Sequence, residues 1–174
     1  IFLFKLLEKG IVNSLYLFHS DVVLKNDISP LEGEIIDELW NKHRNDFLFT
    51  NVRDSSYIKW IKKTKQVLYV SYKGEIIGYI ILHIDDKKKS IMLVDYWSKE
   101  LVCLAKPILL NLLRKYSNMN IIVPSLNVQF EKAAKNLLLI KRKSPQTGFI
   151  YNAKYNTLDP DRSFLCMLQG DYGL

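Results

Sequence analysis

Residues 66–97, QVLYVSYKGEIIGYIILHIDDKKKSIMLVDYW, decide the fold of this chain. Three runs within them, residues 66–72, 75–84 and 90–97, are rich in the β-branched and aromatic side chains that are typical of strands. Lys73-Gly74 joins the first two runs and predicts a tight hairpin, and a polar turn over residues 85–89 joins the last two. The sequence therefore predicts three successive antiparallel strands, a β-meander.

Elements before the meander are predicted from β-branched content and helix-capping residues. Residues 21–28 predict a first strand. Ser29 and Pro30 then predict a helix over about residues 31–44, with Ser29 as its N-cap and Pro30 at its first position. A second, short helix is predicted over residues 55–63.

Elements after the meander complete a mixed sheet. A helix is predicted to end near residue 116, followed by a strand over 120–123 and a helix over about 127–139, with late strands over 147–153 and 163–168. A helix between two strands of one sheet implies a right-handed parallel crossover. We therefore expect an α/β (α+β) fold, with a mostly antiparallel central sheet, one parallel pair in its middle and helices on both faces.

Length and composition favour one globular domain, which we assign to residues 21–174. The chain has 174 residues, 48% of them hydrophobic and 25% charged, which excludes disorder, collagen and coiled coil as descriptions of the whole chain. Its net charge of +7 favours a polyanionic partner, and phosphate-bearing cofactors, nucleic acid and anionic lipid all stay open on this ground.

The segment 1–20 has apolar residues at helical spacing, which predicts an amphipathic helix or the remnant of a preceding domain. Its charges, such as Lys5 and Glu8, argue against a membrane span, and no cleavage site typical of a signal peptide follows. Cys103 and Cys166 form no metal or redox motif and are predicted to be buried free thiols. A cytoplasmic protein is the expectation.

The predicted order of elements resembles the fold of the GCN5-related N-acetyltransferase (GNAT) superfamily, over roughly residues 21–171. Two motifs sharpen the resemblance, Arg53-Asp54-x-x-Tyr57-x-x-Trp60 before a strand and Gly74-Glu75-Ile76-Ile77-Gly78-Tyr79 in the hairpin. They are similar to motifs of GNAT-like acyltransferase domains associated with bacterial surface polysaccharides, and Val94-Asp95 and the closing stretch 169–172 are also similar to that group. The resemblance implies an acyl-CoA-dependent N-acyltransferase.

This resemblance also implies where acetyl-CoA or another acyl-CoA binds. The two parallel strands diverge in that fold, and the amide-rich pantetheine arm satisfies their unpaired main-chain groups. The pyrophosphate then lies at the N-terminus of the following helix. Here the cofactor would contact Leu93, Val94 and Asp95 on one lip and residues 121–125 on the other, with Ser125 and Asn127 among its contacts.

The chain departs from the family in its phosphate loop, because residues 96–107 (YWSKELVCLAKP) contain no glycine. Two local structures stay open. A helix begins at Pro107 after an irregular loop that offers Lys99 and Lys106 to phosphate, or a helix begins at Lys99 and is kinked at Pro107. A second departure lies at residues 137–142, where relatives carry a tyrosine that serves as an acid.

Asp95 is the candidate base for acyl transfer, because it is an acid within an otherwise apolar strand at the cleft. Capping of Ser98 and pairing with a lysine are the structural alternatives for Asp95. Tyr96 and Tyr151 are candidate acids, although each also fits an ordinary half-buried strand position.

The Arg53 motif is expected to fix the second helix against the sheet, and an aromatic wall for a sugar acceptor is the alternative for its aromatic residues Tyr57 and Trp60. His19, His43 and His83 have no metal-binding spacing, so no metal is expected.

The leading functional hypothesis is an N-acyltransferase that uses acyl-CoA and a small-molecule amine, with an amino sugar or a sugar nucleotide as candidate acceptors. The alternative is a catalytically degenerate GNAT-fold module, a binding or structural half of a larger protein with a second GNAT-like domain upstream. A third hypothesis is a basic nucleic-acid binder, which is not favoured because the lysine-rich runs lack interleaved aromatic residues.

Overall fold

The computed structural model describes residues 21–28, 30–46, 50–123 and 128–137. The predicted N-terminal segment 1–20 and the late strands over 147–153 and 163–168 lie outside these described residues.

A five-stranded sheet forms the centre of the described fold, with the strands in the spatial order β1-β2-β3-β4-β5. The strands are β1 (Val22–Lys25), β2 (Gln66–Tyr72), β3 (Glu75–Asp85), β4 (Ser90–Trp97) and β5 (Asn120–Ile122). Neighbouring strands are antiparallel except β4 and β5, which are parallel. The predicted mixed, mostly antiparallel sheet is confirmed, and β5 is the outermost strand of its described part.

The hairpin between β2 and β3 has the predicted two-residue loop. Tyr72 pairs with Glu75, and the loop residues Lys73 and Gly74 have φ angles of 50° and 93°. Two consecutive positive φ angles are the conformation that matches the twist of the flanking strands in a two-residue hairpin. Gly74 adopts this conformation without a steric cost, which explains its place in the loop.

Two helices follow β1 in the chain, α2 (Glu32–His43) and α3 (Ser55–Ile61), with a short 3₁₀ helix, η1 (Arg44–Asp46), after α2. The prediction placed the N-cap of α2 at Ser29 and its first turn at Pro30. This was wrong, because α2 begins at Glu32 and its capping position is Leu31, which makes no side-chain cap. In contrast, α3 has a side-chain cap, because the Asp54 carboxylate accepts a hydrogen bond of 2.9 Å from the Tyr57 N–H.

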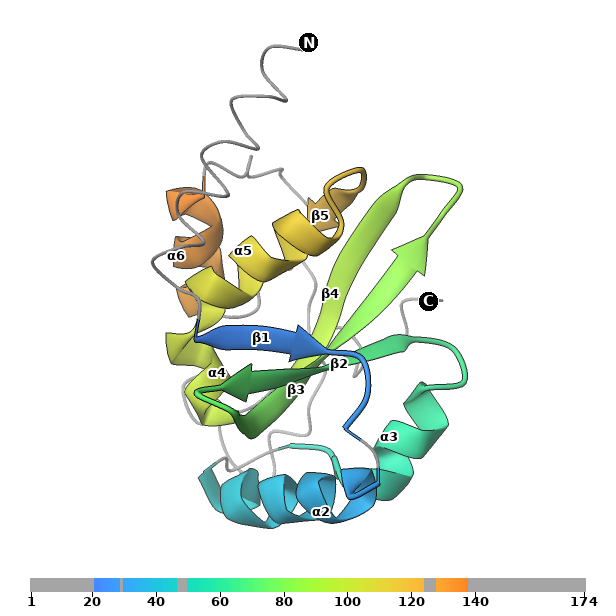
Figure 1. The fold of residues 1–174 in the computed structure, drawn as a ribbon, viewed down its shortest axis with the longest axis vertical. Coiled ribbons are helices and arrows are strands. Elements are labelled where there is room, and N and C mark those ends of the chain that lie inside the picture. Colours follow the sequence, from blue (N-terminus) through green and yellow to red (C-terminus); the bar gives the residue numbers. More distant parts are fainter. Residues whose placement is uncertain (1–20, 29, 47–49, 124–127, 138–174) are drawn as a thin grey trace, which may run out of the picture.

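Helices cover both faces of the sheet, as predicted (Figure 1). One core lies between the sheet and α2 and α3, and it includes Ile36, Ile58 and Trp97. The other lies between the sheet and the later helices α4 (Lys99–Cys103), α5 (Ala105–Lys115) and α6 (Val128–Asn136). Side chains that alternate along β2, β3 and β4 supply both cores, which is why these strands are nearly continuous apolar runs.

β1, the outermost strand opposite β5 in the described part of the sheet, is tied to α5 by a side chain. The Asn111 Nδ2 group donates to the main-chain oxygen of Val22 at 3.0 Å and to that of Pro107 at 2.9 Å. Lys115 at the end of α5 donates to the Asn26 side chain at 2.7 Å, just beyond β1. α5, a helix of the crossover between the parallel strands β4 and β5, therefore runs beside the first strand of the sheet.

Candidate functional site

The parallel pairing of β4 and β5 is much shorter than β4 itself. The paired residues are Ser90 with Asn120, Ile91 with Ile121 and Met92 with Ile122. After Met92, β4 continues to Trp97, and no strand in the described part of the chain pairs with residues 93–97 on the side away from β3. The main chain of this half of β4 is therefore where an amide-rich guest could add as an extra strand.

A β-bulge lies at the start of this half of β4. Leu93 pairs with Leu82 and Asp95 pairs with Ile81, so Val94 is an extra residue between them. Bulges bend a strand and are frequent next to active sites. Leu93 packs in the core under α5, and Val94 packs in the core under α2 and α3. Both side chains are buried, so contacts of these two predicted cofactor-binding residues with a ligand would come from their main chains.

The Asp95 side chain is buried, and both of its carboxylate oxygens accept hydrogen bonds. Its Oδ2 atom accepts from the Arg53 guanidinium and, at 2.9 Å, from the Tyr57 hydroxyl. Its Oδ1 atom accepts from the main-chain N–H of Tyr96 at 2.7 Å. The side chains of Arg53 and Asp95 are 1% and 0% exposed. The partner of Asp95 is thus an arginine from the motif before α3, not Ser98 or a lysine.

Arg53 also contacts the aromatic side chains around it. The centre of its guanidinium lies 5.4 Å from the centroid of the Trp97 ring and 5.7 Å from that of the Tyr57 ring. Its main-chain oxygen accepts from the Tyr79 hydroxyl at 3.3 Å. Burial and the nearby Asp95 charge raise the pKa of Tyr79 well above its ordinary value. We name Arg53, Tyr57, Tyr79, Asp95 and Trp97 the Arg53 cluster.

The Arg53 cluster joins α3 to β3 and β4, as expected for Arg53 and Tyr57. Trp60 lies outside it, because Trp60 is 62% exposed, and its ring centroid lies 6.3 Å from that of Tyr57. An amine substrate would not reach Asp95 in this conformation, because its side chain has no exposed surface. Its role as the base of the reaction stays a prediction.

The turn from β4 into α4 has an unusual backbone. Ser98 has a φ of 125°, which non-glycine residues rarely adopt, and it is completely buried. Its hydroxyl caps α4 by accepting from the Glu100 N–H at 3.2 Å. Although the loop lacks a glycine, Ser98 adopts a conformation that favours glycine.

The helical segment after this turn is divided in two. It begins at Lys99, as one of the two expected structures proposed, but it is interrupted at Leu104 rather than kinked at Pro107. Pro107 has no N–H to donate to Cys103, and its ring would clash with that carbonyl, so α4 ends at Cys103. Pro107 is instead the third residue of α5, where an N–H has no helical partner.

Other predicted residues of the phosphate loop are found around this break. Lys99 is the first residue of α4, and Lys106 is half-buried in the first turn of α5. The predicted burial of Cys103 was wrong. Cys103 is exposed, because it lies on the outer face of the short α4. Cys166 lies outside the described residues.

Tyr96, a candidate acid, packs against α6. Its ring centroid lies 5.0 Å from that of the buried Phe130, with the ring planes tilted by 42°. A side chain of α6 therefore lies against β4 beyond the end of its pairing with β5. Tyr151, Ser125 and Asn127 lie outside the described residues, so their predicted roles stay predictions.

Gly78, in the hairpin motif, allows close approach of the β4–α4 turn to β3. A Cβ atom at Gly78 would overlap the main-chain oxygen of Trp97 and lie 2.9 Å from a methyl carbon of Leu101. This glycine is required by packing around the turn, a reason that the sequence alone did not give.

Ionic contacts also link α2 to α4. Lys42 Nζ lies 2.8 Å from Glu100 Oε1. The buried His43 lies 3.1 Å from Asp46 through Nδ1, and its Nε2 lies 4.0 Å from Glu100 Oε1. Trp97 strengthens this link, since its Nε1–H donates to the Leu39 main-chain oxygen at 3.3 Å. The end of α2 thus supports the same turn.

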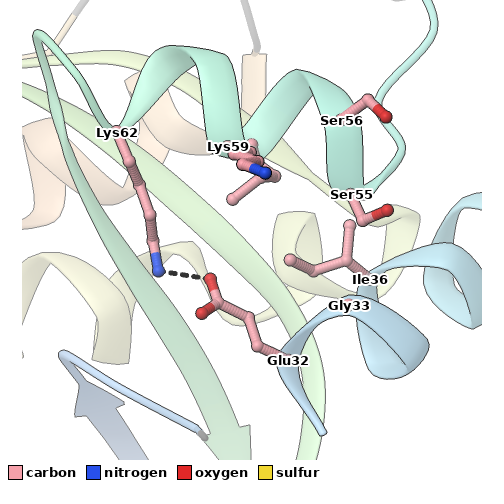
Figure 2. Close-up of a pocket in the computed structure, with 8 residues that line it drawn as sticks. Glu32, Gly33, Ile36, Ser55, Ser56, Lys59 and Lys62 are labelled. Atoms are coloured by element: carbon pink, nitrogen blue, oxygen red, sulfur yellow. Dashed lines mark hydrogen bonds and ion pairs between the residues drawn. The ribbon is translucent and has the colours of Figure 1, made fainter. Parts of the chain in front are cut away.

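A groove of about 410 Å³ lies between α2 and α3. Figure 2 shows Lys62 reaching across it to Glu32. Glu32 also accepts from the Tyr69 hydroxyl. These three residues, which we name the Glu32 trio, join the start of α2 to the end of α3 and to β2. Glu32 and Lys62 line the groove together with Gly33, Ile36, Ser55, Ser56, Ile58 and Lys59.

No group of three or more histidine, cysteine, aspartate or glutamate side chains in the described ranges is arranged to hold a metal ion. Within the same residues, no helix has both the length and the apolar character needed to cross a membrane. Neither a scan against models of known protein families nor a search of curated proteins finds a match for this chain.

Proposed function

We propose that this chain is an acyl-CoA-dependent N-acyltransferase whose cofactor lies along the second half of β4. The observation that carries the proposal is the early end of the β4–β5 pairing at Met92. Residues 93–97 continue as a strand, and within the described residues their outer main-chain groups face no neighbouring strand. Buried main-chain groups need hydrogen-bond partners, and the amides of a pantetheine arm can supply them.

The mixed sheet, the crossover helix after β4 and the strained turn at Ser98 agree with this proposal. Residues in rare backbone conformations cluster at functional sites. In the reaction, the acceptor amine attacks the thioester carbonyl, the carbon–sulfur bond breaks and the CoA thiolate takes up a proton. Asp95, Tyr96 and Tyr151 are the predicted proton-transfer groups. The proposed acceptor is a small-molecule amine, with an amino sugar or a sugar nucleotide as candidates.

Calorimetric titration of the 174-residue chain with CoA and acetyl-CoA tests the cofactor. We expect saturable heat and a rise in the unfolding temperature, since a ligand that binds only the folded state stabilises it. No heat and no thermal shift at millimolar ligand would remove acyl-CoA from the proposal. Release of free CoA thiol with amino-sugar acceptors would then test turnover.

Lys106 provides a sharper test of cofactor placement. If Lys106 contacts a CoA phosphate, Lys106→Ala should weaken CoA binding about tenfold, the value of one charge-assisted hydrogen bond. Lys63→Ala is the matched control, because Lys63 is an exposed lysine that follows α3. Equal affinities of the two variants would show that Lys106 does not contact phosphate.

A binding or structural GNAT-fold module is the second candidate, and the closed surroundings of β4 favour it. The Asp95 side chain has no exposed surface, and Phe130 packs on Tyr96. This candidate predicts that no CoA thiol is released with any of a panel of amine acceptors, whether or not the chain binds CoA. Acetyl-CoA turnover with any amine would exclude it.

A further inference from the structure

The β4–α4 turn holds a strained residue, Ser98, shortly after two side chains that contact the preceding layer of helices. Ser98, at φ 125°, comes directly after Trp97, and Asp95 lies three residues earlier. A strained conformation persists only where the surroundings determine it strongly. The two nearby side chains that point toward α2 and α3, Asp95 and Trp97, both contact Arg53.

We propose that Arg53 is a positioning residue for the β4–α4 turn. Its guanidinium binds the Asp95 carboxylate and packs on the Trp97 ring at the same time. Asp95 in turn accepts from the Tyr96 N–H, so the ion pair fixes the main chain one residue beyond the Asp95 Cα. Trp97 is further held by the Leu39 main-chain oxygen. Together these contacts keep Ser98 in its rare conformation.

The chemistry of the contact requires arginine. A planar guanidinium can donate to a carboxylate in its plane and stack on an indole with its face, whereas a lysine ammonium is a compact point charge that cannot do both in the same way. If acyl-CoA lies along β4, which rests on the proposed function, Arg53 sets the shape of the cofactor cleft without touching the cofactor.

A rescue experiment tests this role. Arg53→Lys and the milder Tyr57→Phe should speed amide hydrogen exchange at residues 96–101 and weaken CoA binding about tenfold. Adding Ser98→Gly should restore both properties, because glycine adopts a φ of 125° without strain. Lys89→Gly is the matched control, because Lys89 also has a positive φ, 48°, but lies in the turn at the opposite end of β4.

Restoration by Ser98→Gly but not by Lys89→Gly supports the positioning role, since a general gain in stability would make both glycines equivalent. Unchanged exchange at residues 96–101 in both Arg53→Lys and Tyr57→Phe would overturn the role, as would equal rescue by the two glycines. If the unmodified chain does not bind CoA, the proposed function fails, and hydrogen exchange alone decides the role of Arg53. If Arg53→Lys does not fold, Tyr57→Phe and its Ser98→Gly combination decide the same question.

Discussion

Two places in this molecule combine a carboxylate, a basic side chain and a tyrosine hydroxyl, and they differ in the burial of the ion pair. In the Arg53 cluster, the Asp95 carboxylate accepts from a cation and from the Tyr57 hydroxyl. In the Glu32 trio, the Glu32 carboxylate accepts from Lys62 and from the Tyr69 hydroxyl. The Arg53 and Asp95 side chains are buried, whereas those of Lys62 and Glu32 are 34% and 27% exposed.

The difference shows that burial determines how much stability the protein loses when one partner of an ion pair is removed. Water screens the charges of Glu32 and Lys62, and it can solvate either charge when the other is lost. Neither Arg53 nor Asp95 has this alternative, so removal of one leaves the other buried without its opposite charge. The buried set also supports a strained turn, whereas the Glu32 trio, with its partly exposed ion pair, joins two helices and a strand.

The largest expected effect is the loss of the buried ion pair. Arg53→Met should lower the free energy of unfolding by about 3 to 5 kcal/mol, because the Asp95 charge stays buried without its partner. Chemical denaturation measures this change, with Lys62→Met as the counterpart in the Glu32 trio. The double variant Arg53→Met/Asp95→Leu should be more stable than Arg53→Met alone. Equal losses for Arg53→Met and Lys62→Met would contradict the comparison.

A smaller effect is expected from the packing above β3. Gly78→Ala should destabilise the fold by about 1 to 3 kcal/mol, because its methyl group would overlap the Trp97 carbonyl. Gly33→Ala is the control at the Glu32 trio, since an added Cβ would meet only the Ser55 Cβ at 3.9 Å. That change lies in the first turn of α2 and should stabilise by about 0.5 kcal/mol. Denaturation midpoints measure both, and a stable Gly78→Ala protein would show that the turn can move away.

Alkaline pH offers a further test of the Glu32 trio. Burial and the hydrogen bond and charge of Glu32 raise the pKa of Tyr69 above its ordinary value of 10.0. The unfolded chain therefore loses this proton first, and the stabilisation present below about pH 10 is lost as the pH rises further. Above this pH, the stability of Tyr69→Phe should therefore fall less steeply than that of the unmodified chain, by about 1.4 kcal/mol per pH unit. An unchanged pH dependence would show that the Tyr69 hydroxyl is exposed to water and that folding does not raise its pKa.

The smallest effect is expected at the exposed ion pair. Glu32→Gln removes the charge of Glu32 and keeps an acceptor for Tyr69. The free energy of unfolding should fall by less than about 1 kcal/mol, and the difference should shrink at high salt. Denaturation at low and high salt measures it. A loss as large as that of Arg53→Met would show that burial does not separate the two sets.

Local sequence signals predicted the described fold well. β2, β3 and β4 were predicted almost to the residue, because alternation, β-branched content and Lys73-Gly74 are properties of neighbouring residues. The start of α2 was placed two residues too early, at Pro30 instead of Glu32, because a Ser-Pro pair favours a helix start without fixing its position. The break at Leu104 was missed, although its cause, the clash of Pro107 with a carbonyl four residues earlier, can be read from sequence.

The candidate site was harder to predict, because its contacts join residues far apart in the chain. Asp95 was singled out as an acid in an apolar strand, but its partner Arg53 lies 42 positions earlier. The rare conformation of Ser98 has no local signal, because serine is not a residue type that usually adopts a φ of 125°. The sequence signal that pointed to the Arg53 cluster was the position of Arg53 just before the short apolar helix α3.

The contact between Asn111 and β1 has a consequence for the behaviour of the protein in concentrated solution. An outermost strand with free main-chain groups can template pairing with another molecule. Here the Asn111 amide already binds the Val22 carbonyl oxygen, and α5 runs beside the strand. The Asn111 side chain thus protects part of β1 from pairing with a strand of another molecule. Asn111→Leu should remove this protection and increase self-association.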